Sequence, residues 1–341
     1  MTLSIFQRIL EIDETLNPQT PVFRIVDFFA AATVIETNEL RFTRSDSFED
    51  RNEGVDRLLS QLELSRPSGC GGMGWNDEIS AIREHDRVKR SHYVSCWTLV
   101  PESVAMWSLY SPEKTAVRLS TTVGKLQNAL LTLVSQQRLA TLTPADLNKA
   151  IQVFASAKLT GVRYANLSNI ASRLYRRNKA FDRLRARYEQ HGQQLPSPTE
   201  VDPRYWKREE QRQLRELTSA FALKDTSFEH EKEVRLVARM GELRVSQTML
   251  DILALPDSEP MKTSVLRRYL QSVPPISEST VPSHLTVRVP DALIESVAID
   301  PRCAPHRAAF IERWFQERGI PVCKSSCFGY LPSKFEVFPP E

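Results

Sequence analysis

Apolar residues along this chain follow two spacings: alternation over short runs, and a three-to-four-residue spacing over longer ones. Short runs rich in β-branched and aromatic residues predict strands over 22–26, 39–43, 92–98, 115–120, 161–167, 229–239, 285–289, 295–299 and 320–324. The longer spacing predicts helices over 27–37, 102–110, 147–159, 167–188, 204–221, 261–272 and 306–319.

The predicted strands come from distant segments, with helices between them and no internal repeat. This order predicts an α+β fold with a mixed or mainly antiparallel sheet and peripheral helices. Helical spacing dominates residues 125–222, which we interpret as a mainly helical insertion within a single elaborated domain spanning residues 1–341.

Composition narrows the setting but names no partner. Apolar residues make up 41% of the 341 positions, charged residues make up 26%, and the net charge of +3 is too small to establish nucleic-acid binding. Because no apolar run approaches membrane-spanning length and the five cysteines are irregularly spaced, we expect a cytoplasmic protein without membrane contact. Cys323 and Cys327 alone make a poor metal site, so no metal is expected.

The stretch EHEKEVR places Glu231, Glu233 and Arg235 at alternate positions of a predicted strand. Alternate residues of a strand share one face, so this face is either solvent-facing surface or the wall of a polar cleft. An earlier acidic turn supplies Glu49, Asp50 and Glu53. Together with Glu231 and Glu233, these carboxylates from two segments could bind Mg²⁺ or act as acid and base. Alternatively, Asp46 and Asp50 cap turns and Glu53 pairs with an arginine.

Four predicted strands each carry one arginine between apolar neighbours: Arg24, Arg41, Arg118 and Arg235. Guanidinium groups at the rim of a sheet can hold a phosphate or pyrophosphate through paired hydrogen bonds. The alternative is that they lie on the solvated sheet face and cover it with their aliphatic stems.

The predicted helix over 102–110 ends in Trp107, Ser108 and Tyr110. Trp107 and Tyr110 are three residues apart and form one aromatic wall, which either packs into the core or stacks a nicotinamide or adenine ring. A second helix carries seven Lys or Arg and one Asp between Arg173 and Arg187 beside an apolar stripe. We expect that stripe, with Leu174, Phe181 and Leu184, to pack on the domain and the arginines to lie in water.

Four segments resemble, in order and spacing, the bacterial family known as domain of unknown function 2971: ELRFTRSDSFEDRNEG, YVSCWTLVPESVAMWSLYSPEKTAVRLS, SFEHEKEVRLV and LIESVAIDP. The matching positions are Phe48, Asp50 and Glu53 in the family's acidic turn, 106–110 in its Met-Trp-Ser-x-Tyr helix, and 231–235 in its Glu-Lys-Glu-x-Arg strand. The departures from the turn pattern are Glu49, Arg51 and Asn52.

A further similarity is to the ADP-ribosyltransferase fold, because Arg24, then Ser108 or Tyr110, then Glu231 and Glu233 occur in the order typical of that fold. This resemblance implies an ADP-ribosyltransferase-like core with NAD as substrate. It implies that Glu233 stabilises an oxocarbenium-like state and that Glu231 prepares the acceptor. It also implies that Arg24 holds phosphate and that the aromatic residue stacks nicotinamide.

Three hypotheses therefore stand. The first is an NAD-using enzyme that modifies a nucleic-acid or protein target, as a toxin or phage-defence effector. The second is a metal-dependent nuclease or phosphoesterase that uses Asp50, Glu53, Glu231 and Glu233, with Lys224 or Lys232 nearby. The third is a non-enzymatic regulatory module whose basic helix contacts nucleic acid.

Overall fold

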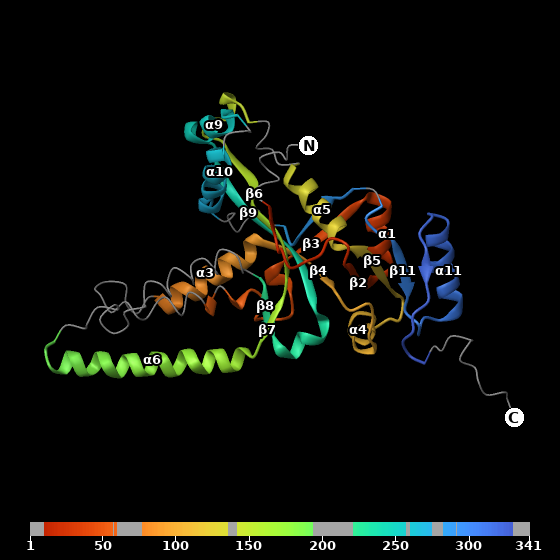
Figure 1. Ribbon diagram of the computed structural model, residues 1–341, viewed down its shortest axis with the longest axis horizontal. Helices are drawn as coiled ribbons and strands as arrows, with labels where there is room; N and C mark the ends of the chain where they lie inside the picture. Colours follow the sequence, from red (N-terminus) through yellow and green to blue (C-terminus); the bar gives the residue numbers. More distant parts are fainter. Residues whose placement is uncertain are drawn as a thin grey trace.

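A computed structural model describes residues 10–56, 58–59, 77–135, 142–193, 221–256, 260–274, 282–290 and 292–329. In these residues a large sheet forms the centre of the molecule and helices lie around it (Figure 1). The predicted α+β class is confirmed. No helix in the described ranges is long and apolar enough to cross a membrane.

Among the residues that the structure describes, the main sheet has ten strands, and most neighbouring pairs in it are antiparallel. Its main path runs β1 (Leu10–Ile12), β6 (Ala150–Gly161), β9 (Glu233–Arg244), β4 (His92–Thr98), β2 (Pro21–Asp27), β5 (Ala116–Thr122), β11 (Ser296–Ile299) and β12 (Val322–Cys323). Branching from β4 are β3 (Glu39–Arg44) and, beyond it, β10 (His284–Arg288). A separate two-stranded parallel sheet consists of β7 (Arg163–Ala165) and β8 (Leu223–Asp225).

The α-helices are α1 (Phe28–Thr37), α3 (Asp77–Ser91), α4 (Val104–Tyr110), α5 (Val123–Ser135), α6 (Leu167–Gln190), α9 (Gln247–Ala254), α10 (Pro260–Ser272) and α11 (Pro305–Gln316). Short 3-10 helices cover Ser45–Ser47, Pro144–Asp146 and Thr226–Glu231. In Figure 1, α9 and α10 lie at one end of the sheet and α11 at the other, and α6 extends away from it.

One predicted helix is contradicted by the structure. The helix predicted over 147–159 is wrong, because Ala150–Gly161 forms β6 in the main sheet, so the 125–222 segment is not helical there. The buried positions in its first half, Ile151, Val153 and Ala155, alternate with more exposed ones, which is the periodicity of a strand. The helix predicted over 204–221 lies outside the described residues except at its last position.

Sheet order decides which side chains meet. Strand β4 lies between β2 and β9, and both neighbours are antiparallel to it. Phe23 of β2 and Glu233 of β9 are both paired with Thr98 of β4, so the residues around them come to the same end of the sheet. Helix α4 starts six residues after β4, with Ser103 accepting a hydrogen bond from the N–H of Met106 as its N-cap.

Candidate functional site

A cavity of about 390 Å³ opens where β2, β4 and β9 meet α4 and the acidic turn. Its charged lining residues are Arg24, Glu49, Asp50, Glu53, Lys224, Glu231, Glu233 and Arg235, and its larger apolar ones include Phe23, Phe48, Trp97, Met106 and Phe228, with Tyr110 beside them. Concave sites that combine apolar walls with a few convergent charged groups are typical of small-molecule binding.

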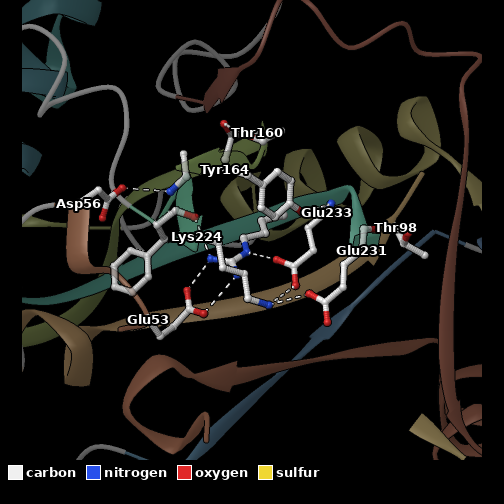
Figure 2. A network of polar contacts seen from close by, with 12 residues as sticks. Glu53, Asp56, Thr98, Thr160, Tyr164, Lys224, Glu231 and Glu233 are labelled. Atoms are coloured by element: carbon white, nitrogen blue, oxygen red, sulfur yellow. Dashed lines mark hydrogen bonds and ion pairs between the residues drawn. The ribbon is translucent and has the colours of Figure 1, made fainter. Parts of the chain in front are cut away.

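Arg235 is the centre of a buried polar network in the wall of this cavity, and Figure 2 shows its carboxylate partners Glu53 and Glu233. Its side chain is only 1% exposed and forms a bidentate pair with Glu53, with Nη2 donating to Oε2 at 3.1 Å. Its Nε donates to Oε2 of Glu233 at 2.6 Å, and Nη1 also donates to the carbonyl of Phe221 at 3.0 Å. A buried guanidinium retains its charge when carboxylates and carbonyls satisfy its donors in this way.

Lys224 extends the network toward the cavity. Its Nζ donates to Oε2 of Glu231 at 2.6 Å and to Oε1 of Glu233 at 2.9 Å, and it lies 4.1 Å from the ring centroid of Phe228. The hydroxyl of Tyr110 donates to Oε1 of Glu231 at 2.5 Å. Lys224 therefore bridges Glu231 and Glu233 by hydrogen bonds, and Tyr110 of α4 contacts Glu231.

The two glutamates have different protonation behaviour. Burial would raise the pKa of Glu233, but Arg235 and Lys224 outweigh it and lower that pKa to about 2. Burial and the neighbouring Glu233 raise the pKa of Glu231 above its ordinary value. Burial and the hydrogen bond to Glu231 also raise the pKa of Tyr110. A carboxylate that is ionised at neutral pH thus lies beside one whose pKa is raised, a division common in acid–base sites.

The local backbone differs from the sequence prediction of one alternating strand. Glu231 ends the 3-10 helix Thr226–Glu231, Lys232 follows in the left-handed region with φ of 41°, and β9 begins only at Glu233. The backbone is fixed here because the Thr98 hydroxyl donates to the Glu231 carbonyl and the Tyr164 hydroxyl accepts from the Glu233 N–H at 2.7 Å. The glutamates share a face through this turn rather than through strand alternation.

Gly54 allows the acidic turn to close over Arg235. Its φ is +72°, and a Cβ at this position would lie 2.5 Å from the ring of Phe221. Asp56 accepts a hydrogen bond from the N–H of Ala222 at 3.1 Å, which ties the turn to the same segment. A glycine next to Glu53 is therefore required both by the backbone conformation and by the close approach of the aromatic ring.

The structure separates the candidate residues into two groups. Arg24, Tyr110, Glu231, Glu233 and Arg235 line the cavity, and the Arg24 Nη1 donates to the Ser95 hydroxyl at 2.9 Å. The candidates outside its lining are Arg41, Trp107, Ser108 and Arg118. Among these, Ser108 and Arg41 are exposed on α4 and β3, and Trp107 is fully buried.

Arg118 and Trp107 belong to a different polar cluster. The Arg118 guanidinium lies 5.0 Å from the ring centroid of Phe23, and its Nη1 donates to the carbonyl of Pro101. The Trp107 indole donates to Glu102 at 3.1 Å, and Glu102 also accepts from the N–H of Ser326. These contacts hold α4 in place, so Arg118 and Trp107 lie outside the cavity but help to position the helix that carries Tyr110.

Sequence reasoning placed Lys224 only in the nuclease hypothesis, and it did not single out Tyr164, Phe221 or Phe228. A lysine seven residues before the first glutamate carries no periodic signal, because a short strand and a 3-10 helix separate the two. The acids of the nuclease hypothesis do gather here, whereas Lys232 is exposed. Cys323 and Cys327 are free cysteines, and no group of three or more metal-binding side chains occurs in the described ranges.

Helix α4, which positions Tyr110, is held at its C-terminal end by Arg302. Nη2 of Arg302 donates to the carbonyl of Trp107 at 2.7 Å and to that of Ser111 at 3.2 Å, while Asp300 fixes the guanidinium through two oxygens. The motif LIESVAIDP, which precedes Arg302, therefore serves the site through α4.

We expect Arg302→Gln to lower the free energy of unfolding by about 1–3 kcal/mol, because hydrogen bonds to a charged group are lost and Asp300 remains buried. Amide hydrogen exchange in α4 should speed up, and thermal unfolding should report the stability loss. Arg313→Gln on the exposed face of α11 is the matched control. Unchanged exchange in α4 would contradict the positioning role.

Residues 106–236 match the family described as "Protein of unknown function (DUF2971)", which confirms the family resemblance. The matched segment runs from the start of α4 into β9 and contains the lysine, the tyrosine, both glutamates and the arginine of the network. No curated protein and no solved structure matches the chain.

Proposed function

We propose that the cavity built around the DUF2971 segment binds NAD, cleaves the bond between nicotinamide and ribose, and transfers ADP-ribose to an acceptor. One observation carries this proposal. Arg24, Tyr110, Glu231 and Glu233 come from different segments of the chain, yet their side chains line one cavity. Its size lies within the range of small-molecule sites.

The charge of the network suits the cleavage step. Glu53, Glu231 and Glu233 carry three potential negative charges against the two positive charges of Lys224 and Arg235. When the bond from ribose C1′ to the pyridinium nitrogen breaks, its electron pair stays with nitrogen and neutral nicotinamide leaves. The sugar becomes oxocarbenium-like, and an excess of fixed negative charge stabilises the positive charge that develops on it.

The two glutamates take different roles under this proposal. Glu233 stays ionised because its pKa is lowered to about 2, so it supplies the fixed charge. Glu231 takes the proton that the acceptor loses as its nucleophile attacks C1′, since burial and Glu233 raise the pKa of this carboxyl above its ordinary value. Tyr110 and Lys224 orient the Glu231 carboxylate by binding one oxygen each.

The walls of the cavity suit the rest of the substrate. Phe48, Phe228 and Tyr110 supply aromatic surface for the nicotinamide ring, and the Arg24 guanidinium offers donors to a phosphate. These residues come from separate segments, so each can be replaced without removing the glutamate pair.

The test is to incubate the purified protein with NAD and measure release of nicotinamide and labelling of acceptor by ADP-ribose. Wild-type protein should release nicotinamide, and Glu231→Gln should lower transfer by about 10²–10⁴-fold, because a general base is lost. Glu229→Gln, on the same 3-10 helix but exposed, should behave as wild type. A folded wild-type protein that neither binds nor cleaves NAD would refute the proposal.

A further inference from the structure

Helix α6 carries a continuous row of exposed basic side chains. Arg173, Arg176, Lys179, Arg183 and Arg187 are all exposed, and successive members are three or four residues apart. Residues at that spacing lie on one face of a helix. The side chains of Leu174, Phe181 and Leu184, predicted to pack on the domain, lie outside those that the structure describes.

We propose that this row, the α6 basic face, binds the phosphate backbone of a nucleic acid. From Arg173 to Arg187 there are fourteen residue steps, or about 21 Å at 1.5 Å per residue, which is long enough to meet several phosphates of one strand. Residues 173–187 hold seven Lys or Arg and one Asp, a net charge of +6, whereas the whole chain has a net charge of +3, so the rest of the chain sums to −3. Positive charge is therefore concentrated on this stretch of the helix.

An aromatic side chain lies beside the row and favours nucleic acid over another polyanion. Tyr175 is 66% exposed, and the Nζ of Lys179 lies 6.0 Å from its ring centroid. Basic side chains that follow a phosphate backbone, together with exposed rings on which bases stack, are the combination used to bind single strands. A free phosphate has no base to stack on this ring, whereas a single strand does.

The first turn of α6 is anchored next to the candidate pocket. Asp225 accepts a hydrogen bond from the N–H of Leu167 at 3.0 Å, and it follows Lys224 directly in β8. On the other side, β7 pairs with β8 and carries Tyr164, which holds the backbone of Glu233. In Figure 1, α6 starts beside β7 and β8 and extends away from the sheet. A nucleic acid on the α6 basic face would thus run outward from the strand that carries Lys224. Binding does not depend on the proposed transferase activity.

The test is fluorescence anisotropy of the full chain with labelled single-stranded RNA and single-stranded DNA of one mixed sequence, at about 50 and 200 mM salt. Wild-type protein should bind at low salt and lose affinity steeply as salt rises. A variant combining Arg176→Gln, Arg183→Gln and Arg187→Gln should bind at least about tenfold more weakly and show a salt slope smaller by about two, because phosphate contacts release counterions.

The matched control replaces three exposed cations elsewhere by glutamine: Lys114, Arg307 and Arg313. It should bind like wild type, and circular dichroism should show equal helix content in all three proteins. The proposal is overturned if wild type does not bind either probe at low salt, or if the α6 variant binds as tightly as wild type. Binding to phosphatidylserine vesicles is measured in parallel. The proposal is also overturned if the α6 substitutions weaken vesicle binding but leave binding to both nucleic acids unchanged.

Discussion

Replacing Arg235 with methionine is expected to lower the free energy of unfolding by about 3–5 kcal/mol. The arginine is 1% exposed and neutralises Glu53 and Glu233 together, so its removal leaves two carboxylates buried without their common partner. Methionine fills much of the same volume, so the loss reports the charges rather than a cavity. Urea unfolding followed by circular dichroism measures it directly.

Arg288→Met provides the matched comparison, because Arg288 is exposed on β10 and its replacement should change stability by less than about 0.5 kcal/mol. A double variant, Glu53→Gln with Arg235→Met, should lose less than the sum of the two single losses, since it removes an unpaired charge along with its partner. Additive losses would show that packing, not charge pairing, makes Arg235 important.

The sequence predicts the helices and strands of this site better than the contacts between their side chains. Alternation located β4 and β9, helical spacing located α4, and the alternating acids pointed to Glu231 and Glu233. Both faces of β9 are buried, whereas the sequence equally allows Arg235 to lie on a solvated sheet face. Its neighbours in the sequence do not show that Glu53 is its partner.

Long-range pairing is what the sequence does not encode locally. Lys224 reaches the glutamates because β8 pairs with β7 and the chain turns back through a 3-10 helix, and neither feature has a strong periodicity. Likewise, the sequence predicts a helix where β6 forms, because Thr143, Pro144 and Asp146 have the pattern of a helix start. Pairing with β9 on one side and β1 on the other outweighs that preference.

Glu233→Gln is expected to lower nicotinamide release by about 10²–10³-fold while NAD binding survives, if this carboxylate stabilises the oxocarbenium-like state as proposed. The substitution keeps the shape of the side chain and its hydrogen-bond acceptor toward Lys224 or Arg235 but removes the charge. Some stability should be lost too, about 1–3 kcal/mol, so turnover must be measured well below the melting temperature of the variant.

The pH dependence of stability separates the structural part of this effect from the catalytic part. The pKa of Glu233 falls from an ordinary 4.5 to about 2 in the folded protein, so the unfolded chain binds more protons between these values. The stability due to Glu233 is therefore complete above about pH 4.5 and is lost as pH falls toward 2. The stability gap between wild type and Glu233→Gln should shrink over that window.

These two measurements on one variant give distinct outcomes. Both roles of Glu233 are supported if Glu233→Gln is less stable than wild type at pH 7 and this stability difference shrinks as pH falls. Turnover must also be slow while the Kd for NAD is unchanged. A variant with the same stability behaviour but wild-type turnover shows that the carboxylate is a structural partner of Arg235 and Lys224 alone. In that case another carboxylate of the cavity stabilises the developing charge, and Glu231, whose oxygens accept from Tyr110 and Lys224, is the next one to replace.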